Sequence, residues 1–205
     1  MRLSRFTRAL GVLASFFMSG ATSLPAATNA PRNTVILLIR HGEKTGDKED
    51  RGLSKAGAKR AQRYVDYFRH YAIDGKSLKL DTAIAAAESK HSNRPVETLQ
   101  PTAQALKIPL EHQIDDKDYA ALAKEFQDGK YNGKNVLVCW HHGKIPELLD
   151  ALGATSATYF PDHHWNEQSF CWLFQLQFDD QGRLNVTAKN VSLLKGDEAF
   201  GKPGP

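Results

Sequence analysis

A run of six residues near the start of the chain, Thr34–Ile39, places the strongest constraint on the fold. Its five apolar residues follow one another without the alternation that marks a strand with one face in water. The run therefore predicts a strand buried on both faces, as in a parallel sheet with helices on each side. Parallel sheets hold ligands at the carboxyl ends of their strands, and Arg40, His41 and Gly42 follow this strand directly. We therefore expect a functional site at this edge of the sheet.

The first 30 residues have the pattern of a secretory signal. Three arginines, Arg2, Arg5 and Arg8, precede an apolar stretch over residues 9–17, and small residues follow. The apolar stretch is short for a membrane anchor, which needs about 20 residues. The pattern predicts cleavage between residues 26 and 30 and export of the mature protein, either to the periplasm or out of the cell.

Residues 31–205 have a suitable length for one α/β domain with its own core. Residues 1–30 carry three arginines and no acidic residue, so the formal net charge falls from +4 to +1 without them. This balanced charge gives no support to nucleic-acid binding. No later stretch is long and apolar enough to cross a bilayer, so no stable membrane span is expected after cleavage.

Strand and helix patterns alternate along this domain. Helical patterns with suitable end signals cover residues 54–71, 95–106, 119–128 and 145–152, and Pro101 is expected to interrupt or kink the second. Strand patterns cover residues 80–87, 108–110, 135–140, 169–178 and 184–194, and the last two are expected to pair as a hairpin. The alternation predicts an α/β three-layer sandwich, in which helices cover both faces of a mostly parallel central sheet.

A second histidine repeats the position of the first. His141 directly follows the apolar run 135–140, as His41 follows the first strand, so both are expected at one edge of the sheet. An imidazole nitrogen can attack phosphorus, and guanidinium groups match phosphoryl oxygens. This combination suits phosphoryl transfer. His142 is the lesser candidate for the second position, because neighbouring side chains of a strand point to opposite faces.

Four separated motifs resemble the histidine phosphatase superfamily, which includes the cofactor-dependent phosphoglycerate mutases and the phosphohistidine phosphatases. They are Arg40-His41-Gly42, the segment Leu53–Ala61, Arg94 followed by Thr98 and Thr102, and His141 after its strand. The resemblance implies a phosphoglycerate mutase-like fold and a phosphohistidine intermediate on His41. It implies that Arg40 and Arg94 bind the phosphoryl oxygens and that His141 completes the pocket. It implies no metal and no cofactor.

The resemblance leaves the proton donor for the leaving group open. The phytase-like branch of the superfamily carries an acid directly after the second histidine, where this chain has His142 and Gly143. Phosphohistidine phosphatases manage without an obvious acid, because a protonated imidazole is a good leaving group. Glu43 and His142 are also expected to line the substrate site. The carboxylates that remain open as the acid are Glu43, Glu111, Asp115, Asp116 and Asp118.

The sequence thus predicts an exported phosphatase that acts on a small phosphomonoester or phosphoramidate. The alternative is a phosphate-binding module of the same fold with weak or no turnover, and a phosphomutase is less favoured because its substrates are cytoplasmic. Cys139 and Cys171 are the two cysteines, and a disulfide and two buried thiols are equally compatible with the sequence. The physiological substrate and the oligomeric state have no signature in the sequence.

Overall fold

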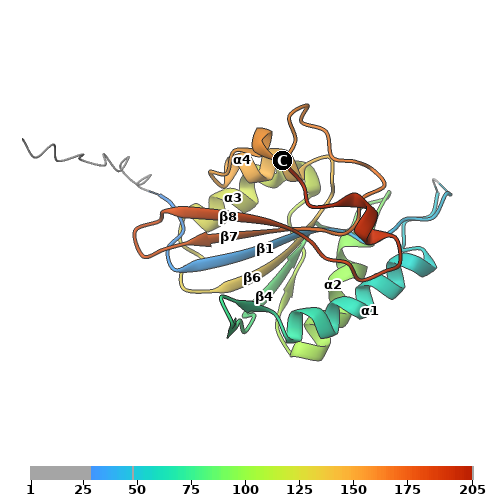
Figure 1. Ribbon diagram of the computed structural model, residues 1–205, viewed down its shortest axis with the longest axis horizontal. Coiled ribbons are helices and arrows are strands. Elements are labelled where there is room, and N and C mark those ends of the chain that lie inside the picture. Colours follow the sequence, from blue (N-terminus) through green and yellow to red (C-terminus); the bar gives the residue numbers. More distant parts are fainter. Residues whose placement is uncertain (1–28, 48, 205) are drawn as a thin grey trace, which may run out of the picture.

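The computed structural model describes residues 29–47 and 49–204, and the predicted signal segment lies outside the described residues except for Asn29 and Ala30. The described chain forms a six-stranded sheet with helices on both faces (Figure 1). The strand order is β5-β4-β6-β1-β7-β8. The strands are β1 (Thr34–Arg40), β4 (Thr82–Ala85), β5 (Leu110–Glu111), β6 (Asn135–Trp140), β7 (Trp172–Phe178) and β8 (Leu184–Asn190).

Most of the sheet is parallel, as the sequence predicts. Strands β5, β4, β6 and β1 run parallel to one another, whereas β7 is antiparallel to β1 and forms a hairpin with β8. The helices are α1 (Lys55–Arg69), α2 (Arg94–Leu106), α3 (Tyr119–Gln127) and α4 (Ile145–Ala151). Short 3-10 turns lie at 116–118, 156–158 and 197–200. The α/β three-layer sandwich expected from the sequence is therefore confirmed.

The apolar residues of β1 divide between two cores, one on each face of the sheet. Ile36 and Leu38 pack with side chains of α3 and α4. Leu37 and Ile39 pack with side chains of α1 and α2 on the other face. All four are 0% exposed, which confirms that this strand is buried on both sides. The two pairs of helices lie on opposite sides of the sheet in Figure 1.

The ends of the elements follow local sequence signals. The Ser54 hydroxyl caps α1 by accepting a hydrogen bond from the Gly57 N–H, as its position predicts. Gly153, with a φ of +88°, follows the end of α4 in the left-handed conformation that suits glycine. These agreements show that the chain around the sheet edge is built from locally consistent elements.

Three details differ from the sequence expectations or resolve them. Helix α2 does not end at Pro101 but continues through it to Leu106. A small hairpin of β2 (Ala72–Ile73) and β3 (Lys76–Ser77), which the sequence analysis did not predict, follows α1. Both cysteines are buried free thiols rather than a disulfide.

None of the helices in residues 29–47 and 49–204 is long and apolar enough to cross a membrane.

Candidate active site

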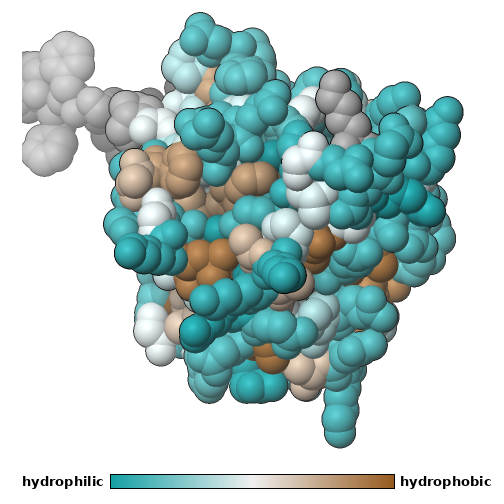
Figure 2. Space-filling model, turned by 90° about the vertical axis from the view of Figure 1, so that its right-hand side faces the viewer, coloured by the Kyte–Doolittle hydropathy of each residue, from teal (hydrophilic) through white to brown (hydrophobic). Residues whose placement is uncertain are grey.

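The carboxyl ends of β1 and β6 bring the two predicted histidines together. The register of the two strands pairs Arg40 with Trp140, and the His41 N–H donates a hydrogen bond to the Trp140 carbonyl over 3.2 Å. The rings of His41 and His141 are in edge-to-face contact, with their centroids 5.0 Å apart. The sheet edge where β1 ends faces the viewer in Figure 2, where hydrophilic side chains predominate around smaller apolar patches. The two strand ends thus meet as the sequence predicts.

His41 is held in one tautomer by its own backbone. The side chain is 2% exposed, and its Nδ1 lies 2.7 Å from the Gly42 carbonyl oxygen. A carbonyl oxygen only accepts hydrogen bonds, so Nδ1 carries the proton and the Nε2 lone pair is free. Burial lowers the pKa of His41 well below that of a free imidazole, and the neighbouring His141 and Arg40 lower it further. His41 is therefore a neutral imidazole with a lone pair available at neutral pH.

The buried guanidinium of Arg40, directly before His41, uses only one of its three nitrogens in hydrogen bonds within the described part of the chain. Its Nη1 donates to the carbonyls of Glu167 and Ser169 over 2.7 and 2.9 Å, and its guanidinium carbon lies 3.8 Å from the ring centre of Phe170. Its Nε and Nη2 are buried with no hydrogen-bond partner among the described residues. Burial lowers the pKa of Arg40 to about 9, so the group stays charged at neutral pH. These two N–H groups suit an anion.

Arg94 brings a second guanidinium to the site from the first residue of α2. Its Nη1 donates to the carbonyls of Asp50 and Arg51 over 3.2 and 3.4 Å. Its Nε is buried without a partner within the described part of the chain. Burial is the main cause of the lowered pKa of His141, and the charge of Arg94 is the next. Arg94 therefore acts on the same imidazole that contacts His41.

Thr98 joins α2 to the loop that follows His41. Its hydroxyl oxygen accepts a hydrogen bond from the Gly42 N–H over 2.9 Å and donates to the Arg94 carbonyl over 2.7 Å. The side chain is 0% exposed. This single hydroxyl links the first turn of the helix that carries one arginine to the residue that fixes the His41 tautomer.

His141 and His142 both stay neutral well below neutral pH. Burial lowers the pKa of each to about 4, helped mainly by the charge of Arg94 for His141 and of Arg40 for His142. The Nδ1 of His142 is buried and has no partner among the residues that the structure describes. His142 also feels the charges of Glu167 and Lys44. Arginine charges thus lower the pKa of both histidines, and His141 is the one whose ring contacts the ring of His41.

The candidate carboxylates differ in their surroundings. The Glu43 carboxylate is bound by Arg60, whose Nη2 lies 2.6 Å from Oε1. Glu111 is bound by Lys130 and Tyr131.

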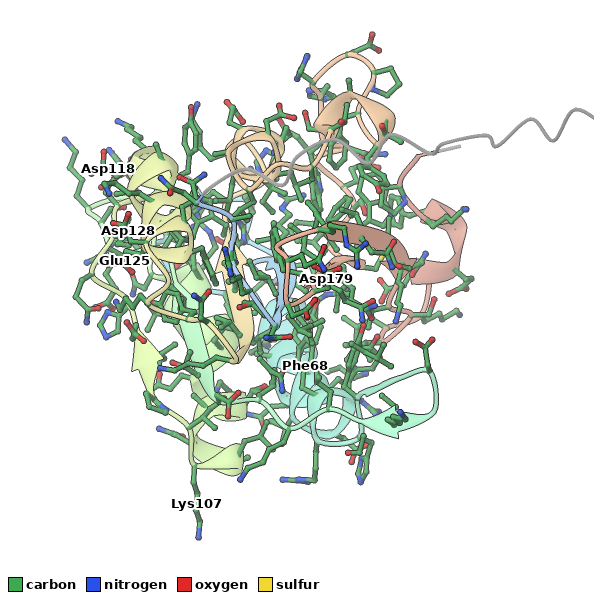
Figure 3. The ribbon with its side chains drawn as sticks, turned by 90° about the vertical axis from the view of Figure 1, so that its left-hand side faces the viewer. Phe68, Lys107, Asp118, Glu125, Asp128 and Asp179 are labelled. Atoms are coloured by element: carbon green, nitrogen blue, oxygen red, sulfur yellow. The ribbon has the colours of Figure 1, made fainter. Side chains whose placement is uncertain are left out.

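The other three lie before and within the turn that precedes α3. Asp118 is exposed and lies on the outer side of the molecule (Figure 3). The charge of Asp115 raises the pKa of His141, against the lowering by burial and by the charge of Arg94. Burial and then a hydrogen bond with Asp115 raise the pKa of Asp116.

Several residues around the site have no role in the sequence analysis. Phe170 and the carbonyls of Glu167 and Ser169 surround Arg40; they lie before β7, which begins at Trp172 and not at Ser169 as the sequence predicted. Arg60 binds the carboxylates of both Glu43 and Asp197. No group of three or more His, Cys, Asp or Glu side chains in residues 29–47 and 49–204 is arranged to hold a metal ion.

Comparison with solved structures finds proteins of similar fold. A phosphoserine phosphatase from Entamoeba histolytica, in complex with phosphoserine, has a TM-score of 0.51 and 15% identity, over 78% of this chain and 98% of that one. A phosphoglycerate mutase from Bacillus anthracis has a TM-score of 0.49 and 13% identity, over 83% and 98%. The protein histidine phosphatase SixA, in complex with tungstate, has a TM-score of 0.46 and 16% identity, over 78% and 99%.

The chain has a fold similar to that of the phosphoserine phosphatase, in agreement with the phosphoglycerate mutase-like α/β fold that the sequence predicts. No model of a protein family matches the sequence, and no curated protein matches it either. The fold therefore agrees with the resemblance seen in the motifs, whereas the chemistry has to be argued from the site itself.

Proposed function

We propose that this protein is a phosphatase that hydrolyses a small phosphomonoester or phosphoramidate through a phosphohistidine intermediate on His41. The observation that carries the proposal is the tautomer of His41, which leaves Nε2 free, together with the buried N–H groups of Arg40 and Arg94 that have no partner among the described residues. A nucleophile with a lone pair, beside two guanidinium groups, matches the needs of phosphoryl transfer. The similar fold of a phosphoserine phosphatase supports the same reaction class.

The proposed reaction has two displacements at phosphorus. Nε2 of His41 attacks the phosphorus atom, and the bond to the leaving group breaks with its electron pair passing to the leaving oxygen or nitrogen. Water then attacks the phosphohistidine, the P–N bond breaks, and inorganic phosphate and the neutral imidazole are released. Arg40 and Arg94 stabilise the charge on the equatorial oxygens in both steps, and the ring N–H of His141 donates a hydrogen bond to one of these oxygens.

The leaving group decides whether a separate acid is needed. A leaving alkoxide needs a proton, whereas a leaving imidazole is already protonated. Asp115 and Asp116 are the candidates that the surroundings favour, because Asp115 acts on His141 and Asp116 has a raised pKa caused first by burial. Glu43 is less suited, since Arg60 holds its carboxylate. The proposal therefore covers both substrate types, and a phosphoramidate needs no separate proton donor for its leaving group.

The test is turnover by the purified protein without residues 1–30. We expect release of phosphate from an aryl phosphate and from phosphohistidine. His41→Ala should lower turnover at least about a thousandfold, because the nucleophile is removed. His91→Ala, an exposed histidine in the turn before α2, is the matched control and should keep the wild-type rate. Undiminished turnover in His41→Ala would contradict the mechanism.

A phosphate-binding module without turnover remains the second candidate. It is favoured by the engagement of Glu43 with Arg60, which removes the carboxylate nearest to His41 in sequence from proton transfer. Vanadate binding without hydrolysis of any compound in a broad phosphate panel would support it. Transfer of the phosphoryl group to a second position of the substrate, instead of release, would indicate a mutase.

We propose further that the protein is exported by its first 30 residues. The support is the arrangement of Arg2, Arg5 and Arg8 before the apolar residues 9–17. Expression of the full chain should yield a processed form outside the cytoplasm, whose N-terminus lies between residues 26 and 31. An unprocessed chain that stays with the membrane fraction would contradict this proposal.

A further inference from the structure

A buried ion-pair cluster connects Glu43, in the loop after His41, to the segment that follows β8. Arg60, on α1, is 1% exposed and contacts two carboxylates. Its Nε and Nη2 bind Glu43, the latter over 2.6 Å, and its Nη1 and Nη2 bind Asp197 over 2.9 and 2.8 Å. The cluster of Glu43, Arg60 and Asp197 therefore ties three segments that are far apart in the sequence.

Asp197 is fixed independently of Arg60. Its Oδ2 accepts hydrogen bonds from the N–H groups of Leu193 and Leu194, both over 2.9 Å. Burial alone would raise the pKa of Asp197, but the hydrogen bonds from Arg60 and these backbone groups lower it. Burial would likewise lower the pKa of Arg60, and the bonds to Asp197 and Glu43 instead raise it above its ordinary value. Arg60 and Asp197 are therefore charged at neutral pH, and the guanidinium of Arg60 holds the Glu43 carboxylate in one place.

The backbone beside Glu43 is the part of the site that orients His41. Glu43 directly follows Gly42, whose carbonyl accepts the His41 Nδ1–H. The Glu43 carbonyl accepts the Ser54 N–H over 2.9 Å, at the start of α1. The Gly57 backbone packs so closely on Glu43 that a side-chain carbon on Gly57 would collide with it. A shift of Glu43 would therefore rotate the peptide that fixes the His41 tautomer.

We infer that Arg60 and Asp197 are positioning residues which, through Glu43, hold the Gly42 carbonyl against His41 and keep the His41 Nε2 free to attack. The catalytic part of this inference rests on the proposed function. Arg60 lies in α1 and Asp197 begins the 3-10 turn at 197–200, and both are linked to the loop after His41 through the Glu43 carboxylate. The same cluster places the negative charge of Glu43 near Arg40, where it favours the charged guanidinium. The account thus assigns a role to the segment after β8.

The test compares two aspartates with the same kind of partners. Asp179, in the turn between β7 and β8, binds one arginine and accepts two backbone N–H groups, as Asp197 does. Figure 3, which faces the opposite side of the molecule from Figure 2, labels Asp179. Asp179→Asn is therefore the control for Asp197→Asn. Glu43→Gln is the second test variant, for the case that Asp197→Asn does not fold. The Glu43 side chain is partly exposed, and glutamine has nearly the same shape as glutamate.

Two measurements separate positioning from stability. Nitrogen-15 NMR of the ligand-free protein reports the His41 tautomer without any need for turnover, and single-turnover kinetics report phosphorylation. We expect Asp197→Asn and Glu43→Gln to show the Nε2–H tautomer and to slow phosphorylation about tenfold to a hundredfold. Vanadate affinity should stay within about twofold, because Arg40 and Arg94 are unchanged. Asp179→Asn should match the wild type in every measurement.

The outcomes distinguish this inference from the proposed function. A wild-type His41 signal and a wild-type phosphorylation rate in the folded variants would overturn the inference and leave the phosphatase proposal intact. A wild-type protein that is never phosphorylated would overturn the phosphatase proposal, whereas the tautomer measurement would still decide the positioning role.

Discussion

Buried imidazoles beside guanidinium groups lose the proton that a solvent-exposed imidazole carries in mild acid. The pKa of His141 and of His142 is lowered to about 4, first by burial and then by neighbouring charges. Both are therefore neutral, like His41, over the range in which phosphate esters carry their negative charges. In the proposed mechanism, the positive charge that meets the substrate therefore comes from Arg40 and Arg94, not from imidazolium.

These lowered pKa values make the folded protein sensitive to acid. Below pH 6.5 the unfolded chain protonates its histidines, but folded His141 stays neutral until about pH 4, so the free energy of unfolding falls over this interval. We expect His141→Gln to reduce this loss by an amount on the order of 2 kcal/mol. Urea unfolding at pH 7 and pH 4.5 measures it. An equal loss in the variant and the wild type would contradict the burial of a neutral His141, and His91→Gln provides the control.

The sequence could indicate Arg40, His41 and His141 because each lies at the end of a buried strand. It could not indicate what surrounds Arg40, because Phe170 and its neighbours lie in an irregular segment whose path is set by tertiary packing. The same limit applies to Glu43. Its place beside the nucleophile suggested an acid or a substrate ligand, and only the fold brings Arg60 to its carboxylate.

At the scale of elements, the first turn of α1 supports the loop after His41 through close backbone packing. Gly57 is buried in this turn, and a side-chain carbon there would collide with the backbone of Glu43. We expect Gly57→Ala to destabilise the fold by about 1–3 kcal/mol and to lower turnover, since the loop has to move. Gly46→Ala, on the same loop with open space around it, should leave both unchanged. Thermal unfolding and kinetics of the two variants measure the effect, and full stability in Gly57→Ala would contradict the packing.

Two elements differ from what the hydrophobic periodicity and the proline position of the sequence predicted. A proline inside a helix costs about 3 kcal/mol, and yet α2 continues through Pro101 because Leu99 and Ala103 are buried against the sheet on either side of it. The hairpin of β2 and β3 turns at Asp74 and Gly75, both with positive φ, which is the Asp-Gly signal of a tight turn. Its strands have two residues each, too short for a periodic pattern.

At the scale of the whole molecule, the two cysteines belong to different cores. Cys139 packs with the α1 and α2 side of the sheet, and Cys171 packs with the α3 and α4 side. Both are 0% exposed, and burial raises the pKa of each thiol. We expect the native protein to resist thiol reagents under oxidising conditions and the unfolded protein to react at both cysteines. A native protein that shows no reactive thiol after unfolding would instead contain a disulfide.

The order of the strands in the sheet, and the contact of the C-terminal segment with α1, could be predicted only in part from the sequence. The alternation of strand and helix patterns indicated a parallel sheet, but it did not predict that β1 lies between β6 and β7 in the sheet. Nor did they place Asp197 beside Arg60, at a separation of 137 residues. Contacts at such separation depend on the topology of the whole sheet. Local periodicity therefore predicted the elements and the site edge, whereas the support of that edge required the fold.

The measurement that tests the central claim most directly is the trapping of a phosphoryl group on His41. The protein is mixed with a phosphorus-32-labelled substrate at single turnover and is denatured rapidly in alkali, in which a phosphoramidate is stable. We predict one labelled peptide, which contains His41, and loss of its label in acid. No label should appear in His41→Ala. Hydrolysis that proceeds without a labelled protein, or a label that persists in His41→Ala, would contradict the account.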